Sequence, residues 1–185
     1  MEIEEKMSIE ETREDIEQKA EDYLEKQLER VNGWLSFAEA KNAGLIAANV
    51  ALLAVIIALF NDAPVFCVIA GVVALGSCAL SFISFLPISK SEELIWKSKE
   101  FDPEKDYNLI FYNDIAEICN LDTYMKLVNE KYFDGAASFS NKAKDLAFEV
   151  MENCKITMNK YKWFKLALKV DLVALACVAI LLIAA

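Results

Sequence analysis

The sequence predicts an all-α membrane protein with three transmembrane helices and a cytoplasmic helical bundle. Hydrophobic residues make up 56% and charged residues 26% of the 185 residues, and the two kinds are segregated into blocks, as a membrane protein requires. Three of these blocks approach the roughly 20 mostly apolar residues that a spanning helix needs. The alternative, three core helices of a soluble domain, would require amphipathic helices to cover them, and the chain has none of suitable size left over.

The three predicted spans differ in their charge content. The predicted spans are residues 43–60, 65–86 and 166–185. Residues 61–64 are the outward link between the first two spans. The first two spans contain no charged residue, and the third carries only Lys169 and Asp171, both near its start. We therefore expect all three segments to insert into a bilayer.

The cations predict the orientation of these spans. All 19 Lys and Arg residues lie between Lys6 and Lys41 or between Lys90 and Lys169. The positive-inside rule then places the N-terminus and the central segment in the cytoplasm, with the link and the C-terminus facing outward. The acidic N-terminus lacks an apolar h-region, so we expect no cleavable signal peptide.

Residues 1–42 are predicted to form one cytoplasmic, coiled-coil-like helix. Ser8 followed by Glu11 has the spacing of a capping box and predicts the helix start. Apolar or small residues then alternate at steps of three and four, which is typical of a coiled-coil seam. These positions are Leu24, Leu28, Val31, Leu35, Ala38, Asn42 and Leu45. No breaker separates this helix from the first span, so we expect a single continuous element.

Residues 87–165 are predicted to form the cytoplasmic helical region. Pro87 is expected to end the helix of the second span, and Asp134-Gly135 is expected to interrupt the segment. From Ser138 onward apolar residues recur at helical spacing, and nothing breaks that pattern before the third span. Because the helices that enter the first and third spans leave the same cytoplasmic body, we expect them to pack together.

Composition argues against an enzyme and against nucleic-acid binding. The chain has no His, which is the commonest general base and metal ligand. It has no Gly-rich phosphate loop, and its five Cys are expected to pack rather than bind a metal or form a disulfide. The net charge of -10 argues against nucleic-acid binding, because proteins that bind nucleic acids carry a basic surface. We expect no catalytic residue, no metal site and no cofactor.

Three motifs resemble those of one known family. "LSFAEAKNAGLIAANVALL" carries a small-acidic-x-Lys-x-small pattern before the first span. "NLIFYNDIAEICNLDTYMKLV" has an aromatic pair, a polar pair and a helix, and "DLAFEVMENCKITMNKYKWFKLAL" has a Lys-Tyr pair before the last span. From about Leu35 to the C-terminus, their order and spacing are similar to those of the Pycsar membrane effector family. Glu39 stands where that family would have Asp, and no Gly follows the aromatic pair.

This resemblance implies a bacterial antiphage effector of the inner membrane. A partner cyclase would make a cyclic pyrimidine mononucleotide (cUMP or cCMP), and the effector would respond by disrupting the membrane. Because three thin spans cannot enclose a pore alone, we expect a homo-oligomer. Two alternatives remain open: a membrane scaffold that assembles partners, and a small constitutive channel.

A site for such a ligand requires a cation, an aromatic face and amide or hydroxyl groups. The richest local concentration of aromatic and amide groups is Tyr107, Asn108, Phe111, Tyr112 and Asn113. The positive charge could come from Arg30, Lys41 or Lys155. In the alternative interpretation, Phe111 and Tyr112 are core residues and one of the two Asn side chains caps a turn.

Polar residues in or near the spans are candidates for coupling and for a path through the membrane. Glu39 belongs to the entry motif, and Asn49 and Asp171 lie within spans, where polar residues are rare and usually face protein or water. We expect Asn49 and Asp171 to line a path between subunits. Asp171 has an alternative, since it lies close enough to the membrane surface to snorkel.

Overall fold

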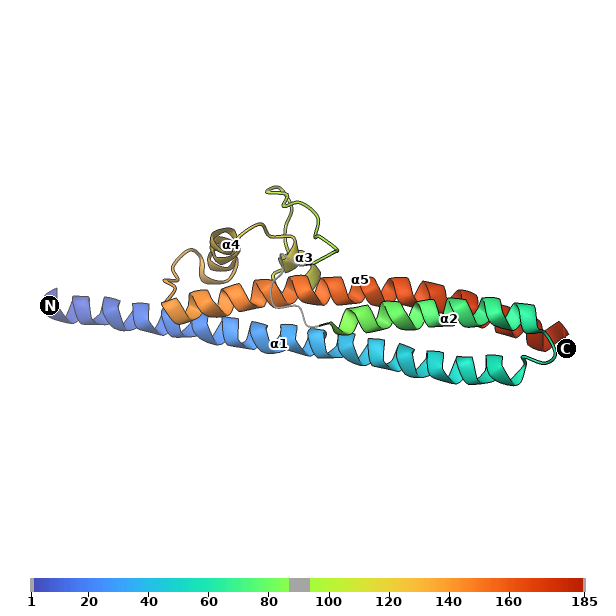
Figure 1. The fold of residues 1–185 in the computed structure, drawn as a ribbon. Coiled ribbons are helices and arrows are strands. Elements are labelled where there is room, and N and C mark those ends of the chain that lie inside the picture. The colour runs from blue at the N-terminus through green and yellow to red at the C-terminus, as the bar shows by residue number, and fades with distance from the viewer. Residues whose placement is uncertain (1, 87–93, 185) are drawn as a thin grey trace. The chain divides into compact units, whose positions relative to one another are not determined.

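The structure is a computed structural model that describes residues 2–86 and 94–184, and its ordered elements are helices (Figure 1). The helices are α1 (Glu2–Ala58), α2 (Pro64–Phe85), α3 (Tyr112–Ala116), α4 (Leu121–Phe133) and α5 (Asn141–Ala184). The described ranges contain no strand. The prediction of an all-α chain is therefore confirmed.

The chain divides into two compact units, which we call unit 1 and unit 2. Unit 1 comprises Met1–Leu35 and Lys90–Met158, and unit 2 comprises Ser36–Ser89 and Asn159–Ala185. Two of the three boundaries fall inside helices, one within α1 and one within α5, and neither helix is interrupted there. The third, between Ser89 and Lys90, lies outside the described residues. The predicted continuity of the two long helices is confirmed.

Helix α1 buries the predicted seam. Val31 and Ala38 are fully buried, and so is Asn42, which continues the same three-and-four spacing toward the apolar end of the helix. The predicted start at Ser8 is wrong, because α1 begins at Glu2 and Ser8 lies inside it. A Ser is also tolerated inside a helix, so the capping-box pattern does not by itself require a helix start at that position.

Among the described residues, two helices are long and apolar enough to cross a membrane, namely α1 and α2. Pro64 is the first residue of α2, a position where its missing N–H leaves no helical hydrogen bond unmade. Helix α5 continues to Ala184, but a third span at residues 166–185 stays a prediction. Pro87, the expected stop after the second span, lies outside the described residues.

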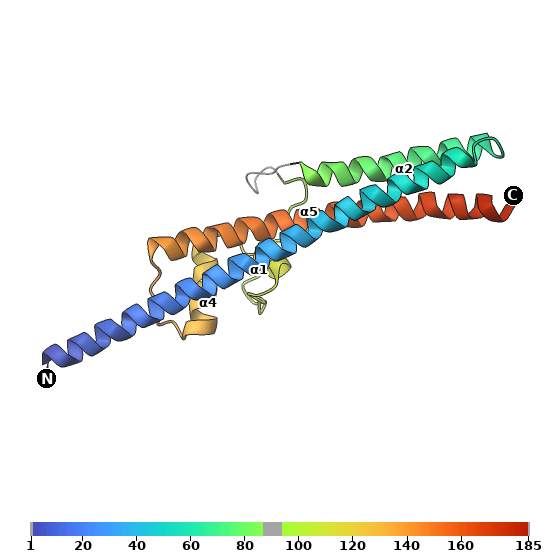
Figure 2. The same cartoon turned by 90° about the horizontal axis from the view of Figure 1, so that it is seen from below.

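Unit 1 packs α3 and α4 against its parts of α1 and α5, with α4 running across their direction (Figures 1 and 2). Its core is built from large apolar side chains, among them Leu24, Val31, Leu109, Ile115, Tyr124, Val128 and Val150. Asn120 caps α4 by accepting a hydrogen bond from the Thr123 N–H at 2.9 Å. The predicted break is confirmed, because Asp134 and Gly135 both adopt positive φ (49° and 77°).

Unit 2 consists of α2 and the remaining parts of α1 and α5, which lie side by side (Figure 2). Its buried apolar cluster is composed mainly of small side chains, namely Ile56, Cys67, Ala70, Ala74, Ala174 and Val178. Small residues allow helix backbones to approach closely, which is how helices associate in lipid.

Candidate functional site

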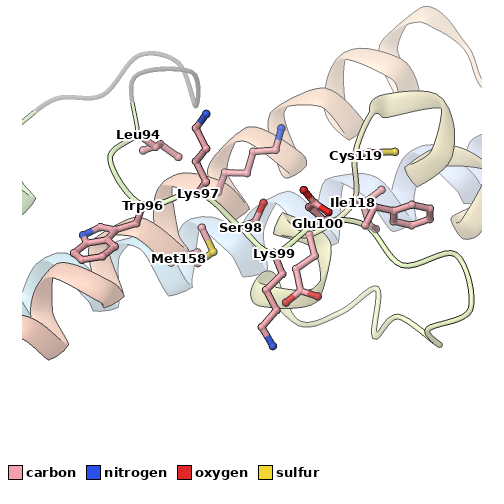
Figure 3. A pocket seen from close by; sticks show the side chains of 12 residues that line it. Leu94, Trp96, Lys97, Ser98, Lys99, Glu100, Ile118, Cys119 and Met158 are labelled. Carbon is pink, nitrogen blue, oxygen red and sulfur yellow. The ribbon is translucent and has the colours of Figure 1, made fainter.

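A cavity of about 540 Å³ opens in unit 1 (Figure 3). One wall is the irregular segment 94–101, another is the end of α3 with the residues after it, and the third is α5. The lining residues are Leu94, Trp96, Lys97, Ser98, Lys99, Glu100, Phe101, Glu117, Ile118, Cys119, Lys155 and Met158. The volume falls within the range typical of small-molecule sites.

The irregular wall is anchored at both ends by buried aromatic or apolar contacts. Leu94 is buried at one end. At the other end the Phe101 ring stacks on Tyr107, with ring centroids 5.3 Å apart and planes tilted by 11°. The buried Tyr107 hydroxyl accepts a hydrogen bond from the Asp102 N–H at 2.8 Å. Because Tyr107 is itself fixed, Phe101 presents its ring to the cavity from a defined position.

The cavity wall carries three lysines and two glutamates, and one glutamate is already neutralised. Lys105 bonds the Glu117 carboxylate at 2.7 Å and Asp114 at 3.2 Å. The hydrogen bond to Glu117 is the main cause of the raised pKa of Lys105, so the Lys105 ammonium stays charged at neutral pH. The other charged residues of the lining are Lys97, Lys99 and Lys155 beside Glu100, and this excess of cations favours an anionic occupant.

The lysines surround the cavity rather than converge on one point. Lys97 and Lys99 leave the irregular segment in opposite directions (Figure 3). Lys155, on α5, makes an ion pair with Glu152 at 3.1 Å. Trp96 and Phe101 offer flat apolar faces, and Ser98 offers a hydroxyl. Such a site suits a compact anion that carries a flat ring. The described residues contain no cluster of His, Cys, Asp or Glu that could hold a metal ion.

Three of the residues predicted from the sequence lie at this cavity or next to it. Lys155 lines it directly. Tyr107 lies behind Phe101, and the Asn113 side chain donates to the Glu117 carboxylate at 3.4 Å. The sequence therefore pointed to the neighbourhood of the cavity, but it did not identify most of its walls.

Phe111, Tyr112 and Arg30 gather at a different place on unit 1. The Phe111 and Tyr112 rings lie 6.4 and 5.7 Å from the Trp34 ring, measured between centroids. Arg30 donates to the Gln27 side-chain oxygen, and the Gln27 amide donates to the Ile110 carbonyl at 3.2 Å. We call Trp34, Phe111 and Tyr112 the aromatic patch.

Asn108 and Lys41 have local partners. The Asn108 side chain accepts from the Ile110 N–H at 3.0 Å, so it caps a turn, as one alternative expected. Lys41 belongs to unit 2, where its ammonium lies 4.5 Å from the centre of the Phe37 ring and 5.2 Å from that of Tyr161.

The predicted coupling residues all lie in unit 2. Glu39 pairs with the buried Lys160 at 3.1 Å. Asn49 is fully buried and donates to the Ser77 hydroxyl at 3.1 Å. One carboxylate oxygen of Asp171 is buried and has no hydrogen-bond partner among the described residues. Sequence reasoning missed Lys160 and Ser77, because pairing across helices depends on a register that one helix does not reveal.

Sequence reasoning also missed Trp96, Lys97, Lys99 and Phe101, the central part of the irregular wall. A signal was present: in "IWKSKEF" aromatic residues flank two lysines within seven positions. Such interleaving of cations and flat rings is common where proteins bind anions that carry a base.

Comparison with known proteins adds one finding. A protein-family model described as the Pycsar effector protein domain matches residues 23–185. No curated protein matches the chain, and no solved structure does.

Proposed function

Because this chain belongs to the Pycsar effector family, which its residues 23–185 match, we propose that it senses a cyclic pyrimidine mononucleotide and disrupts the bacterial inner membrane. The family makes it a membrane effector of antiphage cyclic-nucleotide signalling, which is a signalling role rather than that of a known enzyme family. The finer steps are the nucleotide (cUMP or cCMP), its site and the way in which the membrane is damaged.

The ligand site we propose is the cavity of unit 1. The observation that carries this proposal is the meeting of three lysines with the Trp96 and Phe101 rings around one space of about 540 Å³. An ammonium group would pair with the cyclic phosphate, and an aromatic face would stack on the pyrimidine. Lys97 and Lys155 approach from different elements, the irregular segment and α5, so a bound phosphate would link the two.

Calorimetry on the full chain in detergent tests this site. We expect cUMP or cCMP to bind, and we expect Lys97→Ala and Lys155→Ala each to weaken the affinity at least tenfold, which corresponds to about 1.4 kcal/mol. Lys126→Ala is the matched control, because Lys126 makes only an exposed ion pair with Glu130 on α4. Unchanged affinity in both cavity variants would move the site elsewhere, and the aromatic patch would be the next place to test.

Transmission to the membrane is proposed to run through α1 and α5. Each helix contributes residues to both units without interruption. A ligand that repacks either helix in unit 1 therefore acts on a helix that continues into unit 2. We further propose that the third span is residues 166–185, with the N-terminus cytoplasmic. A reporter active only outside the cytoplasm, fused after Ala185, should be active; activity restricted to a cytoplasmic reporter would contradict this topology.

The response is proposed to need a homo-oligomer, and α1 offers a face for it. Ala74 and Ser77 on α2 are buried within their own chain, so they do not contact a second copy. Helix α1 instead exposes a row of small residues opposite its buried seam: Ser36, Ala40, Gly44, Ala47, Ala51 and Ala58. Rows of this kind support close packing between helices in lipid.

Two glycines make a matched test of the oligomer. A Cβ added at Gly44 on α1 or at Gly76 on α2 would meet nothing within 4 Å in its own chain. We expect Gly44→Leu to reduce assembly, measured by mass photometry in detergent, and Gly76→Leu to leave it unchanged. The opposite result would assign the contact to α2. A chain that is monomeric with and without nucleotide would refute the oligomer.

A further inference from the structure

The contact between α1 and α2 in unit 2 changes character along its length. Near one end, the Asn42 side-chain amide donates to the Ser84 hydroxyl at 2.9 Å. Seven residues further along α1, Asn49 donates to Ser77, seven residues back along α2, at 3.1 Å. The helices are thus antiparallel in constant register, and we call this contact the α1–α2 seam. Two turns of helix separate its polar pairs.

The polar half of the α1–α2 seam contains buried oxygen atoms without a hydrogen-bond partner among the described residues. The Asn42 and Asn49 side-chain oxygens and the Ser81 hydroxyl are buried and have no hydrogen-bond partner among the described residues. Ser81 lies between Ser77 and Ser84 in sequence, so the three atoms are spaced along the same contact. A buried polar atom without a partner is unfavourable, and water or a cation would relieve it.

The other half of the seam is apolar and closed. It contains Ile56, Ala70 and Ala74, all buried, with Val178 of α5 in the same cluster. The helices approach closely here, since a Cβ added at Gly71 would lie 3.9 Å from Cγ2 of Ile56. At the polar end, the Lys160 ammonium bonds the Ser84 carbonyl at 2.8 Å and Glu39 at 3.1 Å, which ties α1, α2 and α5 together.

We propose that the α1–α2 seam is a closed path for monovalent cations within each protomer. Separation of α1 from α2 lets water reach Asn42, Ser81 and Asn49 and opens the apolar seal formed by Ile56, Ala70 and Ala74. The groups without a partner are oxygen acceptors, and the Glu39 carboxylate offsets the Lys160 ammonium at the polar end, so cations are favoured over anions. This inference rests on the proposed function. It places the polar path between α1 and α2 of each protomer rather than between subunits, and because three spans cannot enclose a pore alone, neighbouring copies in the homo-oligomer complete the wall around the separated helices.

A reversible cross-link tests the inference. In Ile56→Cys/Gly71→Cys the two sulfurs would join α1 to α2 at the apolar seal, where a Cβ added at Gly71 would lie 3.9 Å from Cγ2 of Ile56. The full chain is placed in potassium-loaded liposomes, and cUMP or cCMP is added. We expect the oxidised variant to bind nucleotide normally and to release potassium at least tenfold more slowly than wild type. Reduction should restore the rate. The two single-cysteine variants control for pairing with the native cysteines.

A second variant covers incomplete cross-linking. Asn49→Leu keeps side-chain size but removes the polar group, and we expect at least tenfold slower potassium release with unchanged nucleotide affinity. Val50→Leu, on the exposed face of α1, is the matched control. Wild-type release from both the cross-linked protein and Asn49→Leu would overturn the seam path and leave the proposed function standing. A wild-type chain that binds neither nucleotide and does not leak would overturn the proposed function, and the seam path with it.

Discussion

Units 1 and 2 share the helices α1 and α5, but their cores differ. Unit 1 is packed with large side chains and unit 2 with small ones. Unit 1 buries large side chains such as Leu24, Ile115 and Tyr124, as a water-soluble domain does. Unit 2 buries Ala70, Ala74 and a line of serines and asparagines. In lipid the hydrophobic effect does not drive helix association, so close packing and hydrogen bonds must do so. One continuous helix can therefore pack through large apolar side chains in one part and through small and polar side chains in another.

The largest effect should come from placing a charge in the core of unit 1. Val31 is fully buried on α1, and Val31→Asp would leave a buried carboxylate without a partner, which costs about 3–5 kcal/mol. We expect the variant to insert into membranes but to lose membrane damage, measured as viability and membrane potential after expression. Val31→Ala, which introduces no charge, is the control. Full activity of Val31→Asp would reduce this part of α1 to a tether.

Removing bulk should damage unit 1 next most. Ile115 is fully buried on α3, and Ile115→Ala should lower the free energy of unfolding by about 2–5 kcal/mol through lost burial and a residual cavity. Thermal unfolding followed by circular dichroism measures this. The exposed Ile110→Ala serves as the control. Equal melting temperatures for the two variants would show that unit 1 lacks the packed core described above.

Adding bulk should damage unit 2 instead, by a smaller amount. Ala70 is fully buried in the α1–α2 seam, and Ala70→Leu would force the helices apart at a cost of about 1–3 kcal/mol. If the seam is the leak path, this variant should release potassium without nucleotide. Ala79→Leu, on the exposed side of α2, is the comparison. A silent Ala70→Leu would mean that the seam tolerates wider spacing than its contacts indicate.

The smallest effect we expect is a pH dependence of the melting temperature, caused by the Glu21 carboxylate in unit 1. Ser140 and Lys142 hydrogen-bond the Glu21 carboxylate and lower its pKa below the ordinary value of 4.5. A lowered folded-state pKa gives stability that is present above the unfolded pKa and lost as pH falls through the folded one. Melting of wild type should therefore drop slightly more than that of Glu21→Gln between pH 6 and about pH 3. Identical pH profiles would remove Glu21 from the account.

The sequence predicted helices well and contacts between helices poorly. The burial of Leu24, Val31 and Ala38 on α1 could be predicted from their three-and-four spacing alone, because the sequence of one helix shows which of its faces is apolar. Lys155 was predicted as a ligand residue and lines the cavity, whereas Lys97 and Lys99, which also line it, were not predicted, since an irregular segment has no periodicity to read. The pairing of Asn49 with Ser77 depends on the register between α1 and α2, and no local pattern encodes that register. Ser8 did not predict the helix start correctly, because a Ser is also tolerated inside a helix and α1 begins at Glu2.

The central claim is that unit 1 detects the nucleotide and unit 2 opens the membrane. Potassium release from liposomes tests both halves when cUMP and cCMP are titrated against wild type, Lys97→Ala and Asn49→Leu. We predict that one nucleotide triggers release from wild type, that Lys97→Ala needs at least tenfold more of it, and that Asn49→Leu binds it without release. Release that is independent of nucleotide, or equally impaired binding in both variants, would contradict the division of labour between the two units.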